Sequence, residues 1–165
     1  MRMRGVRYEA ALLGGNIRVW LAADVSAEIR SRLDEALLNI NAHAGDLESG
    51  HGGILGRLKS IRVDAKAKRC FVLERSAALT LTPGYIEACS AAFIGSAIAH
   101  DAFHVEQFRA GGVAGSRGVD AEREAFAFQL DFGRRIGIAE YEAEYLRGLI
   151  EDPDQLRDYF YSEIR

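Results

Sequence analysis

Two of the four histidines in the chain, His100 and His104, lie four positions apart in the segment AIAHDAFHVEQFRAGG (97–112). Residues at this spacing share one face of a helix, so the two imidazoles can point at one position. A tetrahedral metal ion such as zinc accepts two nitrogen ligands in this way. Asp101 adds a carboxylate that can take a proton from a metal-activated water. The pair alone is weak evidence, because many structural helices carry two histidines at this spacing.

The residues around the two histidines favour a metal site. The preceding segment, AAFIGSAIA (91–99), is almost wholly apolar, so the helix that carries the pair is expected to be central to the fold. Buried imidazoles need partners, and a metal ion would satisfy both. Eighteen positions after His104, the segment DAEREAFAFQ (120–129) offers Glu122 and Glu124 near the beginning of another helix. Either carboxylate would complete a three-ligand zinc site with the fourth position open for water.

The order of these motifs resembles that of a known enzyme family. HDAFH (100–104), followed after a glycine-rich loop by EREA (122–125), is similar to the gluzincin branch of the zincin metallopeptidases, which read HExxH and then ExxA. The resemblance covers residues 70–137 and includes the strand-like ALTL (78–81). In zincins a strand precedes the active-site helix, and its edge receives the peptide substrate. The family implies zinc-dependent hydrolysis of peptide bonds, by a self-standing bacterial protease or by a toxin or effector domain.

The resemblance assigns a role to each matching residue. It implies that His100 and His104 bind zinc and that Asp101 is the general base. It implies Glu122 as the third ligand, because the alanine of the ExxA motif then follows three positions later, and Glu124 is the alternative. The implied partner is a peptide or protein substrate.

The chain departs from the family pattern at two positions. Asp101 replaces the glutamate of HExxH, and its shorter side chain would place the carboxylate about 1.5 Å further from the water. A displacement of about 1 Å can cost about 100-fold in rate, so the site is expected to bind zinc better than it catalyses. Phe126 occupies the position where many relatives have an aspartate that orients a ligand histidine. Asp131 and Glu106 are the candidates for that second role.

A metallopeptidase also needs a group that stabilises the oxyanion of the transition state. The available side chains of suitable type are Tyr141, Tyr145 and His51. The helical spacing of the two tyrosines favours packing in the core over catalysis. His43 and His51 are expected to be exposed to solvent.

Three other functions are left open by the sequence. A zincin fold with the shorter acid could have lost catalysis and serve as a binding module. The doublet at 100–101 also occurs in HD-type metal-dependent phosphohydrolases, which are all-helical and would need His43 or His51 as an upstream ligand. Strand-like segments within 61–81 disfavour that class. The DxxH spacing at 101–104 fits half of a ferritin-type di-metal motif, but the chain offers no second half.

The N-terminal half is expected to form a sheet and one helix. YEAALL (8–13) and IRVWLA (17–22) flank a Gly-Gly-Asn turn, which predicts a β-hairpin. Apolar residues at helical spacing predict an amphipathic helix over 25–43, followed by a glycine-rich loop over 46–53. Further strand-length segments separated by charged turns are 61–65, 70–74 and 78–81.

The C-terminal half is expected to be helical. A long helix is predicted from the Thr82-Pro83 cap to Gly111-Gly112. Further helices are predicted over 121–136, with Asp120 as N-cap and Gly137 as stop, over 139–150, and after the Asp152-Pro153 cap. The expected fold is α+β and zincin-like, with a small antiparallel or mixed sheet, an active-site helix and a helical C-terminal half.

Size and charge narrow the class of protein. At 165 residues, of which 48% are hydrophobic and 27% charged, the chain is expected to form one domain over 1–165. A formal net charge of −3 argues against a nucleic-acid or membrane partner. Because no apolar run reaches the about 18 residues of a membrane span, and none fits a signal peptide, a cytoplasmic location is expected unless the chain is delivered by a partner or belongs to a longer protein. Cys70 and Cys89 are expected to be buried free thiols.

Overall fold

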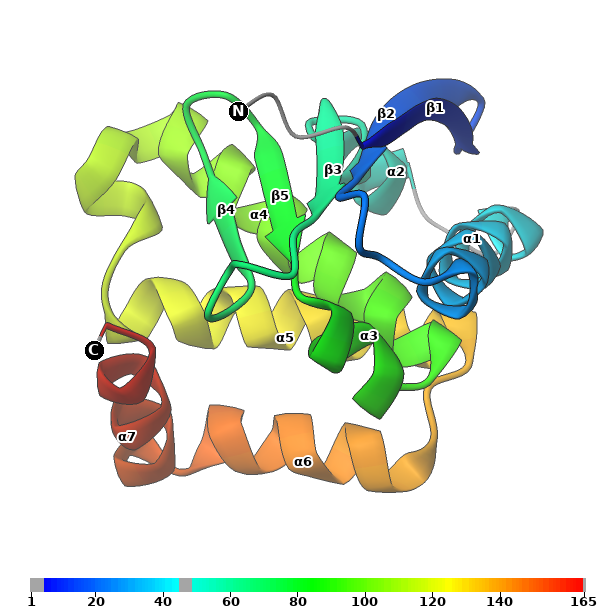
Figure 1. Cartoon of the computed structure of the whole chain (residues 1–165). Helices are drawn as coiled ribbons and strands as arrows, with labels where there is room; N and C mark the ends of the chain where they lie inside the picture. Colours follow the sequence, from blue (N-terminus) through cyan, green and yellow to red (C-terminus); the bar gives the residue numbers. More distant parts are fainter. Residues whose placement is uncertain (1–4, 45–48, 165) are drawn as a thin grey trace.

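The strands lie in the N-terminal half of the chain and form one mixed sheet (Figure 1). The computed structural model describes residues 5–44 and 49–164. Their strands are β1 (Val6–Leu12), β2 (Gly15–Leu21), β3 (Ser60–Val63), β4 (Phe71–Leu73) and β5 (Ala78–Leu81). The predicted hairpin and the strand-length segments between 61 and 81 are therefore confirmed as strands.

The order of strands across the sheet is β1-β2-β3-β5-β4. β1 and β2 form an antiparallel hairpin, and Leu13 and Gly14 at its turn have φ values of 47° and 81°. β3 is parallel to both β2 and β5, while β4 is antiparallel to β5. The expectation that ALTL (78–81) has a free edge is wrong. A tight turn folds β4 back onto β5, so β5 is enclosed and β4 is the edge strand.

Two helices lie between strands β2 and β3: α1 (Ala27–Ala42) and α2 (Ser49–Leu55). The part of the chain after β5 is helical, and its described residues form α3 (Pro83–Ala88), α4 (Ala91–Ser116), α5 (Val119–Ile136), α6 (Glu140–Glu151) and α7 (Pro153–Ile164). α4 passes behind β4 and β5 in Figure 1. Apolar side chains of the inner sheet face, such as Ile61 and Leu79, are fully buried in one core with Ile94 and Ile98 of α4. The predicted α+β class with a mixed sheet is confirmed. No helix in the described ranges is long and apolar enough to cross a membrane.

The long helix predicted from residue 83 to 110 is interrupted. Ser90 begins a new helix, because its hydroxyl accepts a hydrogen bond from Phe93 N at 3.0 Å. The regular helix breaks at Gly112, where φ is 63° and ψ is −154°, as the glycine pair predicted, and a further helical segment of α4 follows the kink up to Ser116. Part of the loop predicted over 46–53 is likewise helical, as α2; residues 45–48 lie outside the described residues.

The remaining helix boundaries follow the predictions closely. α5 begins after Gly118 instead of Asp120, and it ends at Gly137, whose φ of 86° is the left-handed conformation that suits glycine. Asp152 caps α7, because its Oδ1 accepts hydrogen bonds from the backbone N–H groups of Asp154 and Gln155. Cys70 and Cys89 are free thiols, each only partly buried.

Candidate metal centre

The side chains of His100, His104 and Glu122 meet where α4 packs against α5. Both histidines lie on the buried face of α4, one turn apart, because the helix is apolar on almost every side up to this point. After the kink in α4, the chain turns at Gly118 (φ 108°) and enters α5. Glu122 therefore lies in the first turn of α5 and faces the two imidazoles.

The ligand atoms of the three side chains converge. His100 Nε2 and His104 Nε2 are 3.1 Å apart, and each lies 3.4 Å from a different carboxylate oxygen of Glu122. One potential ligand atom from each residue falls within 4.8 Å of the others. Two imidazole nitrogens and a carboxylate are a donor set that suits zinc and other transition metals. The group could therefore hold a metal ion, and we call it the metal centre.

The orientation of His104 is fixed from its far side by Gln107. Gln107 Oε1 lies 2.9 Å from His104 Nδ1, and Gln107 Nε2 donates hydrogen bonds of 3.0 Å to Ala121 O and to Glu124 Oε2. An acceptor on Nδ1 selects the tautomer whose Nε2 lone pair is free for a metal. Gln107 was missed from the sequence, although its position three residues after His104 places it on the same helix face. Glu124 belongs to this outer layer and not to the metal centre.

His100 has a different environment. Its Nδ1 is buried and has no hydrogen-bond partner among the described residues. The ring of Phe126, at the position where many gluzincins have an aspartate, packs against the imidazole with centroids 4.6 Å apart. Neither predicted replacement for that aspartate reaches the metal centre: Asp131 bonds to His51, and Glu106 bonds to Arg57. The two imidazoles are thus supported unequally.

Electrostatics favour a charged Glu122 beside protonatable histidines. Burial opposes ionisation of Glu122, but hydrogen bonds and charges from His100 and His104 outweigh it and hold the pKa of this carboxyl well below its usual range. Burial also opposes protonation of His104, yet the hydrogen bond and charge of Glu122 raise the pKa of that imidazole. A concentrated negative charge facing two nitrogen donors is the electrostatic environment that a divalent cation requires.

Asp101 lies beside the metal centre without joining it. Burial raises the pKa of its carboxyl to about 6, against the opposing charges of His100 and His104. Its side chain faces two cavities that meet at this point. A carboxyl group that titrates near neutral pH and faces a cavity has the properties of a general base.

The first cavity, which we call the metal cavity, has a volume of about 400 Å³ and opens on the metal centre. The edge strand β4 forms one wall through Phe71 and Val72, and Arg117 lies on another. The second cavity, the side pocket, measures about 320 Å³ and has apolar walls that include Leu81, Phe93 and Leu146. The carboxylate of Asp101 therefore lines both cavities.

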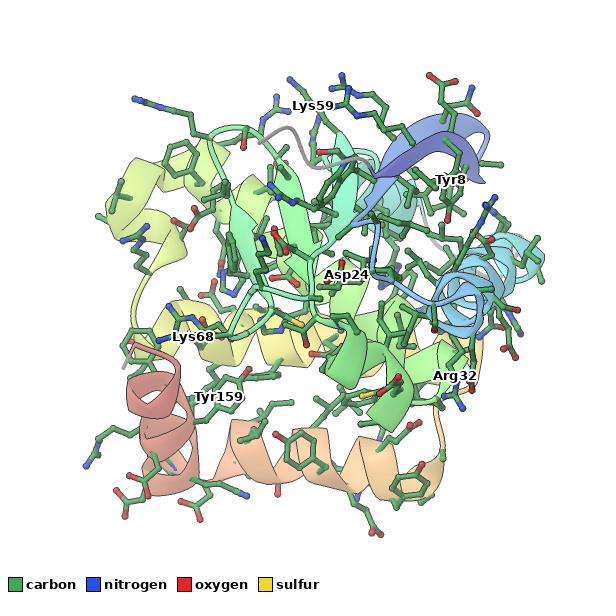
Figure 2. The ribbon with its side chains drawn as sticks, viewed as in Figure 1. Tyr8, Asp24, Arg32, Lys59, Lys68 and Tyr159 are labelled. Atoms are coloured by element: carbon green, nitrogen blue, oxygen red, sulfur yellow. The ribbon has the colours of Figure 1, made fainter. Side chains whose placement is uncertain are left out.

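Tyr159 of α7 lines both cavities. Figure 2 shows its side chain extending from α7 toward α5, where its ring meets Phe126 edge to face at 5.1 Å. This placement could not be predicted from the sequence, because α7 is distant from the metal centre along the chain and reaches the metal cavity only through tertiary packing. Tyr159 thereby brings a phenol to the wall that Asp101 and His100 share.

The predicted exposure of the remaining tyrosines and histidines differs from that in the structure. Tyr141 and Tyr145 were predicted to pack in the core, but they are 69% and 48% exposed, because the apolar face of α6 is formed by other residues. His51 was predicted to be exposed, but it is buried, with its ring against Phe128. His43 is partly buried at the end of α1, and its Nδ1 lies 2.9 Å from Asn39 O.

Comparison of the chain with protein families, with curated proteins and with solved structures finds no match. Any indication of function therefore comes from the metal centre and the cavities around it.

Proposed function

We propose that this chain is a zinc-dependent metallopeptidase of the zincin type. One observation carries the proposal: two imidazoles one helical turn apart and a carboxylate from the next helix converge at an accessible cavity. This combination supports the resemblance to HExxH followed by ExxA, because it brings together the same three positions that the resemblance assigns to the metal.

Each residue has a role in the proposed reaction. His100, His104 and Glu122 hold the ion, and Gln107 holds His104 in the tautomer that binds it. Zinc supplies Lewis acidity and activates a water molecule for attack. Asp101 accepts the proton of the attacking water and returns it to the leaving amine. Burial raises the pKa of this carboxyl to about 6 in the metal-free chain, and the positive charge of the ion would lower it.

The walls of the cavities support an extended peptide as substrate. Within the described residues β4 pairs with β5 and with no other strand, and it forms a wall of the metal cavity. A peptide that pairs with this edge would pass over the metal centre. The side pocket would then receive an apolar side chain of the substrate, and Tyr159 provides a phenol near the reacting carbonyl.

A metal-binding module without catalysis is the second candidate. The shorter side chain of Asp101 favours it, because its carboxylate would lie further from the water than that of a glutamate. The phosphohydrolase alternative lacks support, because neither His43 nor His51 belongs to the metal centre and His51 is bonded to Asp131 instead.

Metal analysis combined with a peptidase assay tests both candidates. The purified chain is stripped with a chelator, titrated with Zn²⁺ and assayed on a library of fluorogenic peptides. We expect one tightly bound zinc ion per chain and slow hydrolysis that increases in Asp101→Glu. A matched control, His43→Ala, should retain the zinc ion.

The possible results separate the functions. Zinc binding with no hydrolysis, even in Asp101→Glu, would replace the peptidase by the binding module. Two metal ions and activity on phosphate esters would favour the phosphohydrolase. Zinc affinity that is unchanged in His100→Ala would rule out the metal centre itself.

A further inference from the structure

The sheet has a second face, which is turned away from α4 (Figure 1). Alternation along the strands places Ile61 and Leu79 on the inner face, where both are fully buried. Their neighbours in sequence point the other way. Those neighbours include Arg18, Trp20 and Arg62, which line a groove on this side of the sheet.

Strand register arranges the outer side chains in two rows. Successive Cα partners across all five strands give a first row of Arg7, Trp20, Arg62, Thr80 and Phe71. The second row, two residues away from the first on each strand, is Glu9, Arg18, Ser60, Ala78 and Leu73. Each row therefore begins with charged side chains and ends with an apolar one.

The two rows enclose a wide groove of about 1100 Å³, which we call the outer groove. Small side chains in the middle of the sheet, Ser60 and Ala78, form its floor. Phe71 and Leu73 form an apolar wall on the edge strand, and they are 38% and 53% exposed. The arginines of the other strands form a cationic wall. A groove with one apolar and one cationic wall is complementary to an amphipathic segment that carries acidic side chains.

The arginines of the cationic wall differ in the partners that they already have within the chain. Arg62 stacks on the Trp20 ring, with Cζ 4.2 Å from the centroid, and also pairs with Asp64 at 2.9 Å. Glu9 lies opposite Arg18. The residues that line the outer groove nevertheless include three arginines and one glutamate, whereas the whole chain has a net charge of −3. The groove is therefore positively charged in a chain that is negative as a whole. Arg7 and Arg18 are the side chains through which it would attract carboxylates.

We propose that the outer groove docks an acidic, amphipathic segment of a partner protein. Apolar side chains of that segment would cover Phe71 and Leu73, and its carboxylates would pair with Arg7 and Arg18. A single-stranded nucleic acid fits less well, because it needs an open aromatic face for stacking, whereas Arg62 covers the Trp20 ring. The inference does not depend on the proposed peptidase activity, because Arg7, Arg18 and Leu73 line the outer groove and not the metal cavity, although Phe71 lines both.

The protein carries its own reporter for this test, because Trp20 is the only tryptophan of the chain and lies in the groove. The full chain is titrated with a synthetic amphipathic peptide that has glutamates on one face and leucines on the other. We expect a saturable change in Trp20 fluorescence that weakens with added salt. The same peptide with lysines in place of the glutamates should give no such change.

Matched variants locate the binding surface. Arg18→Glu and Leu73→Ser should each weaken binding of the acidic peptide by about tenfold or more, as expected for a charge and an apolar contact at an interface. Arg134→Glu and Leu38→Ser, exposed positions on α5 and α1, are the controls and should leave the affinity unchanged.

Several outcomes would overturn the proposal. Equal binding of the lysine peptide, or equal weakening by the control variants, would show that the association is unspecific. Tighter binding of a single-stranded oligonucleotide at Trp20 would assign the groove to nucleic acid. A concentration-dependent change in Trp20 fluorescence without peptide, with dimers in sedimentation, would assign it to a second copy of this chain.

Discussion

Two buried imidazole groups use the same residue types in different ways. In the metal centre, two imidazoles and Glu122 converge beside a cavity. In the other group, His51 of α2 makes a 2.7 Å contact with Asp131 of α5 and packs against Phe128 and Phe132. The first group directs three potential ligand atoms at one point, whereas the second joins one imidazole to a carboxylate that is 55% exposed.

The difference teaches how to distinguish a site from a structural contact. Burial of a histidine beside an acid is common to both groups. Only the metal centre has several lone pairs directed at one point, an outer hydrogen bond that fixes a tautomer, and space beside it. We therefore expect His51 and Asp131 to join α2 to α5, and the metal centre to bind an ion.

The largest expected effect separates the two groups by metal binding. His104→Ala removes a ligand, so zinc affinity should fall by more than the about 100-fold that loss of an outer hydrogen bond costs. His51→Ala should leave zinc affinity unchanged and instead lower the free energy of unfolding by about 1–3 kcal/mol. Competition with a chromogenic chelator measures the affinity. Equal loss of zinc in both variants would remove the distinction between the groups.

The next effect concerns catalysis at the metal centre. Asp101→Asn keeps the shape of the side chain but removes the proton acceptor, so peptidase activity should fall by about 10²–10⁴-fold while zinc remains bound. Asp131→Asn is the matched control from the other group and should retain activity. Initial rates on the best library peptide, with zinc content measured on the same samples, decide the outcome. Full activity of Asp101→Asn would show that another group is the base.

A smaller effect tests the outer hydrogen bond to His104. Gln107→Leu removes the acceptor at Nδ1, so zinc affinity should fall by about 10–100-fold. Gln107→Glu keeps an acceptor oxygen at this position and should recover part of the loss. The thermal midpoint of the metal-free variants serves as the control for folding. If zinc affinity falls only in proportion to that midpoint, Gln107 has a purely structural role.

The smallest effect is a dependence of stability on pH. Burial raises the pKa of Asp101 to about 6 in the folded chain, above its ordinary value of 3.8, so folding disfavours the ionised form. Stability from this group is complete below pH 3.8 and is lost as the pH rises through about 6. In metal-free protein, Asp101→Asn should therefore raise the free energy of unfolding at pH 7.5 by on the order of 2 kcal/mol and leave it unchanged near pH 4.

Urea unfolding of the metal-free chain at the two pH values measures this effect. Asp131→Asn, which loses a hydrogen bond at an exposed carboxylate, should show no gain at pH 7.5. A gain of the same size in both variants would trace the effect to net charge and not to burial of Asp101.

Much of the fold could be predicted because its signals are local. The hairpin follows from two alternating segments around a glycine turn, and the end of α5 follows from a glycine in the left-handed conformation at Gly137. The spacing of His100 and His104 likewise fixes their common face, because helical geometry depends on only one turn of chain. The choice of Glu122 needed the resemblance as well as the spacing.

What could not be predicted depends on contacts between distant segments. Gln107 reaches Ala121 and Glu124 only because α5 returns alongside α4. The edge position of β4 depends on pairing across the whole sheet, and the burial of His51 depends on the position of α2 against α5. The break at Ser90 is local, but the same hydroxyl is also compatible with a helix interior, so only the packing of α3 and α4 decides it.

The ligands of the metal centre come from two helices with a kinked segment between them. In the unfolded chain they are far apart on average, so an ion bound to all three closes a loop in the way a disulfide does. An ion present at about 100 times its dissociation constant would add about 2.7 kcal/mol to the free energy of unfolding. The supply of that ion in the surroundings would then set how long the folded chain survives proteases.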